Sequence, residues 1–127
     1  MANLVLVGIG GALGSMARHG IGTAIAHLSP TRVTPYATMV VNLAGCLAIG
    51  VLAGLVASHR LTMPAPVRAF VFVGILGGFT TFSSFGLDTF TLAHGGHTGD
   101  ATLNVAIQVA AGLALVAGGY AAGARVQ

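Results

Sequence analysis

The sequence predicts an all-α membrane protein with four transmembrane helices. Of its 127 residues, 55% are hydrophobic and only 6% are charged, whereas a soluble domain carries about 25% charged residues. The mean hydropathy is +0.93. Four apolar stretches are each long enough to cross a hydrocarbon core of ~30 Å as a helix. We therefore expect residues 1–127 to form a single membrane domain.

The four spans follow one another with short connections. We expect them at about 2–27, 36–58, 66–93 and 101–124. The first begins almost at Met1 and has no basic segment before it, so we interpret it as a span and not as a signal peptide. Proline-rich segments at 30–35 and 64–66 separate the first three spans, and a glycine loop at 94–100 precedes the fourth. With such short loops, any functional site lies within the membrane or at its edge.

The third span contains an unusual polar segment. Residues 77–85 read Gly-Gly-Phe-Thr-Thr-Phe-Ser-Ser-Phe. Adjacent glycines weaken a helix, and interrupted backbone at membrane depth is tolerated only beside protein or a water-filled path. We therefore predict a helix that is broken mid-membrane and serves an ion pathway. Hydroxyls and ring edges suit an anion, while freed carbonyls suit a small cation, so the residues alone do not identify the ion.

Glycine and charge patterns bear on assembly. Small residues recur at close-packing spacings in the first, second and fourth spans, which favours tight helix contacts. Four short helices enclose little pore, so we expect an oligomer. We expect Arg60, Arg68 and Arg125 on one side of the membrane, against Arg32 on the other, joined by Arg18 if it snorkels that way. This small bias favours cytoplasmic termini but also permits a dimer of oppositely inserted copies. No basic cluster points to nucleic acid.

Several polar residues lie within the spans. Arg18 either snorkels to the interface or has a functional role. Asn42 could join helices through a hydrogen bond or donate to a passing anion, and Asn104 and Gln108 have the same two interpretations. Asp88 lies near the end of the third span, where interfacial solvation accounts for it.

Three motifs resemble those of the Fluc (CrcB) family of fluoride channels. They are the first-span segment from Gly10-Gly11 to Arg18, the second-span segment Ala37-Thr38-Met39-Val40-Val41-Asn42-Leu43-Ala44-Gly45, and the third-span segment from Gly74 to Phe85. The third is the most specific. Length and span count also match, so the resemblance covers essentially the whole chain.

The resemblance implies a mechanism and an assembly. Members are antiparallel, dual-topology homodimers in the bacterial inner membrane that passively export fluoride and reduce its toxicity. A structural sodium ion (Na+) at the dimer centre is held by main-chain carbonyls, here those of Gly77 and Thr80. The positions that match the fluoride path are Asn42, Phe82, Phe85, Thr81, Ser83 and Arg18.

Some positions depart from the family pattern. His19 stands where an aromatic residue is common, Ala37 replaces a glycine, and Asp88 replaces a glutamate. In the fourth span, a pore-side serine or threonine is missing, and Gln108 is the substitute that we expect to line the path.

Other classes fit less well. A small multidrug resistance-type exporter or a fluoride/proton antiporter needs a titratable group in the membrane, and the chain has no Glu. A purely structural subunit has no use for a hydroxyl-rich interrupted span. An enzyme is not expected, because no His-Cys-Asp cluster is present.

Overall fold

The computed structural model describes residues 2–28 and 35–125; residues 29–34, with Arg32 of the charge comparison, lie outside this part. Within the described residues the chain is helical and contains no strand. Four helices are long and apolar enough to cross a membrane: Asn3–Leu28, Tyr36–Ala57, Ala65–His94 and Thr98–Arg125. The four predicted spans are therefore confirmed, with ends that differ by only a few residues.

The third and fourth spans are each divided into segments. The first two spans are single helices, α1 (Ala2–Leu28) and α2 (Tyr36–Ala57). The third comprises α3 (Ala65–Arg68), the π-helical η1 (Ala69–Leu76), α4 (Gly77–Phe79) and α5 (Phe82–His94). The fourth comprises α6 (Thr98–Ala106), the π-helical η2 (Ile107–Ala111) and α7 (Gly112–Arg125).

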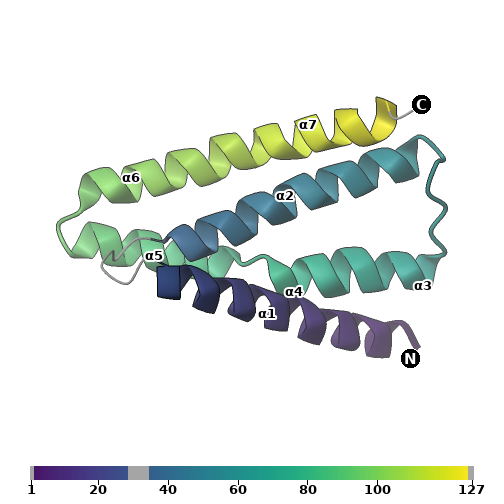
Figure 1. Cartoon of the computed structure of the whole chain (residues 1–127), viewed down its shortest axis with the longest axis horizontal. Coiled ribbons are helices and arrows are strands. Elements are labelled where there is room, and N and C mark those ends of the chain that lie inside the picture. The colour runs from purple at the N-terminus through teal and green to yellow at the C-terminus, as the bar shows by residue number, and fades with distance from the viewer. Residues whose placement is uncertain (1, 29–34, 126–127) are drawn as a thin grey trace.

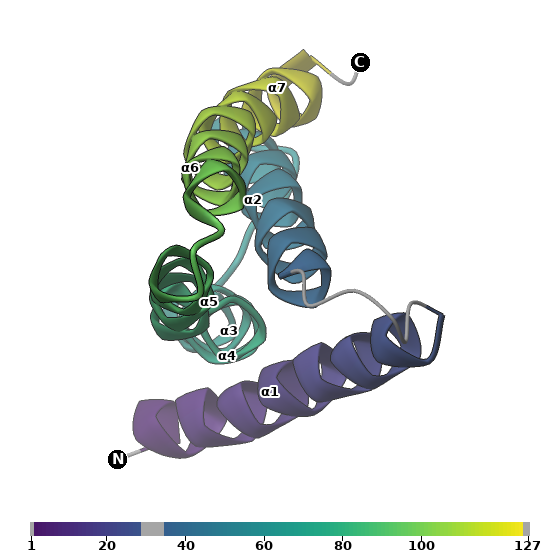
Figure 2. The same cartoon turned by 90° about the vertical axis from the view of Figure 1, so that its left-hand side faces the viewer.

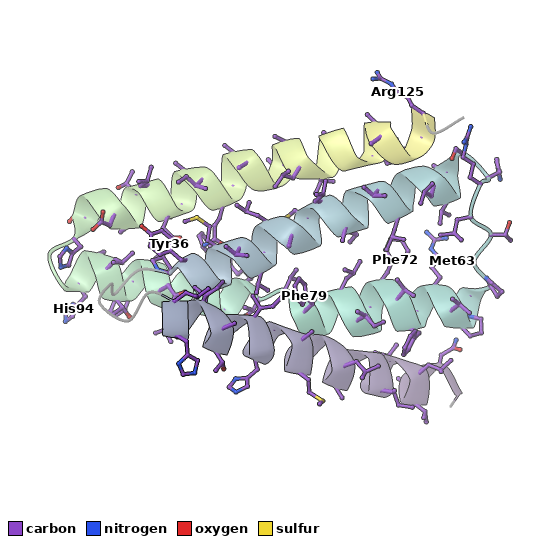
Figure 3. The ribbon with its side chains drawn as sticks, viewed as in Figure 1. Tyr36, Met63, Phe72, Phe79, His94 and Arg125 are labelled. Carbon is purple, nitrogen blue, oxygen red and sulfur yellow. The ribbon has the colours of Figure 1, made fainter. Side chains whose placement is uncertain are left out.

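The spans run lengthwise through an elongated molecule. In Figure 1, both chain ends and the α2–α3 connection lie at one end, and the α5–α6 connection lies at the other. Figure 2 shows α1 on one side of α3, α4 and α5, with α2 and α7 on the other side. Met63 and Arg125 mark the end with the termini in Figure 3. Arg60, within the α2–α3 connection, and Arg68, at the end of α3, belong to the same end, as the span count predicts.

Glycines allow α1 to lie directly against the third span. A Cβ placed on Gly10 would meet the Phe70 carbonyl at 2.7 Å, and one on Gly74 would meet the Gly10 Cα at 3.0 Å. A Cβ on Gly78 would strike the Gly11 carbonyl. These helices approach backbone to backbone, which only glycine permits at these positions.

A second glycine-lined contact joins α2 to α7. A Cβ on Gly119 would lie 2.7 Å from the Leu47 carbonyl. Cβ atoms on Gly50, Gly54 and Gly123 would likewise strike the facing backbone. The sequence-based interpretation of these glycines as packing residues is confirmed. The backbone-to-backbone contacts leave many large apolar side chains facing outward, among them Leu4, Met16, Leu87 and Leu113.

The two adjacent glycines of the third span, Gly77 and Gly78, are helical. Gly77 has φ −64° and ψ −37°, and α4 continues to Phe79. The backbone departs from helix only at Thr80 (φ −85°, ψ 160°) and Thr81 (φ −153°, ψ 116°). Glycine propensity therefore predicted the wrong position for the interruption, because close packing of Gly78 on Gly11 holds this turn helical.

Candidate functional site

Thr81 starts α5 as its N-cap. Its hydroxyl oxygen accepts a hydrogen bond from the Ser84 backbone N–H at 3.2 Å, and it also lies 3.1 Å from the Ser83 hydroxyl. Threonine in extended backbone is a favoured N-cap, because its side chain satisfies an N–H that the first turn leaves unpaired. The Thr-Thr-Phe-Ser-Ser sequence thus ends one helix and begins the next.

Asn42 of α2 binds the backbone of Thr81 from the side. Its Oδ1 accepts from the Thr81 N–H at 2.9 Å, and its Nδ2 donates to the Thr81 carbonyl at 3.2 Å. The backbone groups that leave the helix at Thr81 are therefore paired inside the protein, as the membrane requires. The first interpretation of Asn42, a hydrogen bond that joins helices, is confirmed, whereas donation to a passing anion stays a prediction.

Gly45 makes room for this arrangement one turn further along α2. A Cβ on Gly45 would collide with the Thr80 Cγ2 methyl and would lie 3.6 Å from a Phe79 ring carbon. The Thr80 hydroxyl donates back to the Leu76 carbonyl at 2.9 Å. The pair Asn42 and Gly45 thus fixes Thr80 and Thr81 against α2, with one bond-forming residue and one residue that lacks a side chain.

Gln108 of η2 extends the polar contacts to the fourth span. Its Oε1 accepts from Asn42 Nδ2 at 2.7 Å, and its Nε2 donates to Asn104 Oδ1 at 2.8 Å. Asn104 in turn donates to the Thr89 hydroxyl at 2.9 Å. Asn104 is 2% exposed and is the buried polar side chain among the described residues. Asn104 therefore joins helices through hydrogen bonds, which is the first of the two interpretations given above for it.

A cavity of about 380 Å³ lies at this junction. Its walls come from α2, η1, α4, α5 and η2, and Figure 3 shows the wall residue Phe72 reaching from η1 toward α2. Seven of the residues that we predicted for the fluoride path or the sodium site line it: Asn42, Gly77, Thr80, Thr81, Phe82, Phe85 and Gln108. The cavity therefore combines amide and hydroxyl groups with aromatic and aliphatic walls.

The two predicted ring residues lie together. The Phe82 and Phe85 ring centroids are 5.4 Å apart with planes tilted by 48°. The Phe82 ring is 83% exposed in the single chain. This residue therefore lies on the outside of the single chain, beside the amide groups of the cavity.

Two predicted residues do not line the cavity. Ser83 lies on the exposed side of α5, although its hydroxyl contacts Thr81. Arg18 lies partly buried on α1, away from the cavity walls. Their roles in an ion path remain predictions.

The carbonyls assigned to sodium have a suitable setting. In a continuous helix, the Thr81 N–H would donate to the Gly77 carbonyl, but here it donates to Asn42. Gly77 is also exposed. A freed carbonyl oxygen beside an interrupted helix is the type of ligand that sodium takes in membrane proteins. The Gly77 carbonyl therefore fits the ion, and the part of the Thr80 carbonyl stays a prediction.

Asp88 stands out among the polar groups of α5. Its Oδ2 is buried and has no hydrogen-bond partner within residues 2–28 and 35–125. Sequence reasoning assigned this residue to interfacial solvation, and the buried oxygen shows that one side of the carboxylate is shielded instead. In the same described part, no three His, Cys, Asp or Glu side chains lie close enough to hold a metal.

Thr89 was missed by sequence reasoning. It is an ordinary hydroxyl on α5, and its bond to Asn104 joins residues 15 positions apart. The only sequence signal was the four-residue spacing of Asn104 and Gln108, which places two amides on one helix face.

The fold and the site define a multi-pass membrane protein with a polar junction inside a four-span helical unit. The chain belongs to the CrcB-like family, described as "CrcB-like protein, Camphor Resistance (CrcB)", whose model matches residues 5–120. It is 48% identical over 124 residues to the fluoride-specific ion channel FluC of Rhodospirillum centenum, covering 97% of this chain and 93% of the relative. It is 43% identical to the FluC of Methylobacterium sp. strain 4-46, covering 95% of each chain. The Chloroflexus aurantiacus FluC is 45% identical over 97 residues, covering 76% of this chain and 75% of the relative.

Proposed function

We propose that this chain is a fluoride-specific channel that passively exports fluoride from the cytoplasm across the bacterial plasma membrane and so lowers fluoride toxicity. Relatives that are named fluoride-specific channels are similar over nearly the whole chain. The observation that carries the proposal is the junction of Asn42 with Thr81 at the cavity, since it holds amide donors beside an interrupted helix inside the membrane.

The interruption gives this site an electrostatic preference for an anion. The N-terminus of α5 carries partial positive charge from unpaired N–H groups, and it begins at the cavity wall. Fluoride is small and accepts hydrogen bonds strongly. Asn42 N–H groups, the Thr81 hydroxyl and the ring edges of Phe82 and Phe85 replace its water, whereas a larger halide accepts hydrogen bonds from these groups less strongly. Gln108, Ser83 and Arg18 are assigned to the same path.

The C-terminal end of α4 has the opposite character. We assign the Gly77 and Thr80 carbonyls to a structural sodium ion at the centre of the assembly. Support comes from the Thr81 N–H, which is turned away from Gly77 by Asn42. When bound, the ion supplies positive charge that holds carbonyls of neighbouring segments together.

The working unit in this proposal is an antiparallel homodimer, in which the interruption at Thr80–Thr81 is a break at mid-membrane. In the single chain, Phe82 is 83% exposed next to the polar cavity. Polar groups facing lipid are costly, so a second copy is the natural cover for this side. The weak arginine bias of the sequence allows insertion in both directions.

A resistance assay tests this function in cells. The chain is expressed in a bacterial strain that is sensitive to fluoride because it lacks its own exporter. Growth in millimolar fluoride should be restored by the wild-type chain but not by Asn42→Asp at equal membrane abundance. Equal growth of cells with and without the wild-type chain would contradict the proposal.

A further inference from the structure

A directional chain of hydrogen bonds runs from Asn42 to the backbone of α5. Asn42 Nδ2 donates to Gln108 Oε1 at 2.7 Å, and Gln108 Nε2 donates to Asn104 Oδ1 at 2.8 Å. Asn104 Nδ2 donates to Thr89 Oγ1 at 2.9 Å, and the Thr89 hydroxyl donates to the Phe85 carbonyl at 2.7 Å. We call Gln108, Asn104 and Thr89 the relay. It connects α2, η2, α6 and α5.

The two ends of the chain fix the orientation of every amide between them. At one end the Phe85 carbonyl can only accept, so the Thr89 hydroxyl donates its one proton there and accepts from Asn104. Asn104 must then turn its oxygen toward Gln108. By the same logic, Gln108 turns its oxygen toward Asn42.

The Thr81 end of the chain independently requires the same amide orientations. The Thr81 N–H can only donate, so it requires the Asn42 oxygen on its side, which leaves the Asn42 NH₂ toward Gln108 and the cavity. The hydrogen-bond partners of an amide determine which of its atoms is oxygen and which is nitrogen. Here the Thr81 N–H and the Phe85 carbonyl, at opposite ends of the chain, require the same set of orientations. Turning one amide over would place like groups against each other, at a cost of about 1–3 kcal/mol per unpaired group.

Helix geometry supports this relay. Asn104, Gln108 and Gly112 all face α2 or α5, at successive spacings of four residues. Each such step turns an α-helix ~40° past one full turn, so the residues would drift off one face. The π-helical segment η2 (Ile107–Ala111) takes up an extra residue per turn and keeps them aligned.

We propose that Gln108, Asn104 and Thr89 are positioning residues that hold the NH₂ group of Asn42 toward the fluoride path. This inference rests on the proposed function. Gln108 takes the stronger of the two Asn42 N–H bonds, at 2.7 Å, and leaves the longer one, at 3.2 Å to the Thr81 carbonyl, as the donor that turns to a passing anion. The buried Asn104 anchors the relay at a position that does not line the cavity.

The decisive variant is Thr89→Val, which keeps the shape of the side chain and removes the terminal hydroxyl. Thr89 does not line the cavity, so any effect on transport passes through the relay. We expect fluoride efflux from liposomes to fall roughly fivefold, the effect of one hydrogen bond. Thr89→Ser keeps the hydroxyl and should restore the wild-type rate.

Thr102→Val is the matched control. Thr102 makes the same bond to the carbonyl four residues earlier, Thr98, but it is exposed and lies outside the relay. Its efflux should equal that of the wild type. In an Asn42→Ala background, Thr89→Val should cause no further loss, because the relay then has nothing to orient. If Thr89→Val does not assemble, Asn104→Leu takes its place, because it interrupts the relay with a side chain of similar size at a position that does not line the cavity.

An NMR measurement tests the relay without any transport. In ¹⁵N-labelled protein in detergent, the side-chain NH₂ signals of Asn42 should shift in Thr89→Val and stay unchanged in Thr102→Val. Unchanged Asn42 signals, or equal efflux in Thr89→Val and Thr102→Val while the wild type conducts fluoride, would overturn the inference. A wild type that conducts no fluoride would instead overturn the proposed function. The NMR result would still show whether Thr89 affects the Asn42 NH₂ group.

Discussion

The Asn42 side chain pairs with both backbone groups of Thr81, accepting from its N–H at 2.9 Å and donating to its carbonyl at 3.2 Å. The two residues are 39 positions apart and belong to different spans. This one pair explains how both backbone groups of Thr81 leave helical geometry and stay paired inside the protein, and why amide donors lie beside the interruption.

The two functions of Asn42 can be separated with Asn42→Asp. The carboxylate keeps an acceptor for the Thr81 N–H but removes the donors to Thr81 and Gln108 and adds a repelling charge. We expect fluoride efflux to fall by roughly tenfold or more, equivalent to about 1.4 kcal/mol, with the protein still assembled. Efflux from liposomes and size-exclusion chromatography provide the two measurements. Unchanged efflux would remove Asn42 from the fluoride path.

Gly45→Ala should disturb the site by steric pressure alone. The added Cβ collides with the Thr80 Cγ2 methyl, and overpacking of this kind costs about 1–3 kcal/mol. We expect slower efflux and a lower melting temperature. The double variant Gly45→Ala/Thr80→Ser removes that methyl and should recover most of both losses.

Gly99→Ala is the control for the glycine substitution, since a Cβ there meets nothing within 4 Å. It should leave efflux unchanged. Absence of recovery in the double variant would show that Gly45 acts on something other than Thr80.

Phe82→Ile tests the aromatic wall. The ring edge is lost while an apolar side chain of moderate size remains. Because Phe82 is 83% exposed in the single chain, its loss opens little space in the chain itself. We expect efflux to fall several-fold, with the proposed dimer unchanged on chromatography. A normal rate would make this ring a packing residue.

Asp88→Asn distinguishes a channel from proton-coupled transport. Asp88 is the carboxylate within the third span, and its Oδ2 is buried without a partner in the described residues. A passive channel has no need of a titrating group, so wild type and variant should both release fluoride with no proton gradient. If release requires a gradient and Asp88→Asn abolishes it, the antiporter class applies.

Removal of sodium tests the assigned cation. Protein purified and reconstituted with N-methylglucamine in place of sodium should lose fluoride efflux, and added sodium should restore it. Because main-chain carbonyls are the assigned ligands, side-chain variants such as Thr80→Ser should leave the sodium dependence unchanged. Full efflux without sodium would contradict this assignment.

The sequence predicted the spans well because hydropathy and the proline and glycine residues between spans are local signals. It placed the helix interruption at Gly77–Gly78, whereas the structure leaves the helix at Thr80–Thr81. Two contacts that are distant in sequence cause this difference: Gly78 is held helical against Gly11, and Thr81 is captured by Asn42. Local propensity contains neither contact.

The candidate site was predicted residue by residue but not as a connected unit. Asn42 and Gln108 were singled out as separate amides, and the structure joins them directly. The bond from Asn104 to Thr89 depends on how α6 lies against α5, so no local pattern predicted it.

The central claim is that this chain conducts fluoride passively and selectively. The most direct measurement is halide efflux from liposomes that contain the purified protein, followed with fluoride and chloride electrodes and no pH gradient. The account predicts rapid fluoride release without chloride release. Assembled protein that releases no fluoride, or releases chloride equally fast, would contradict it.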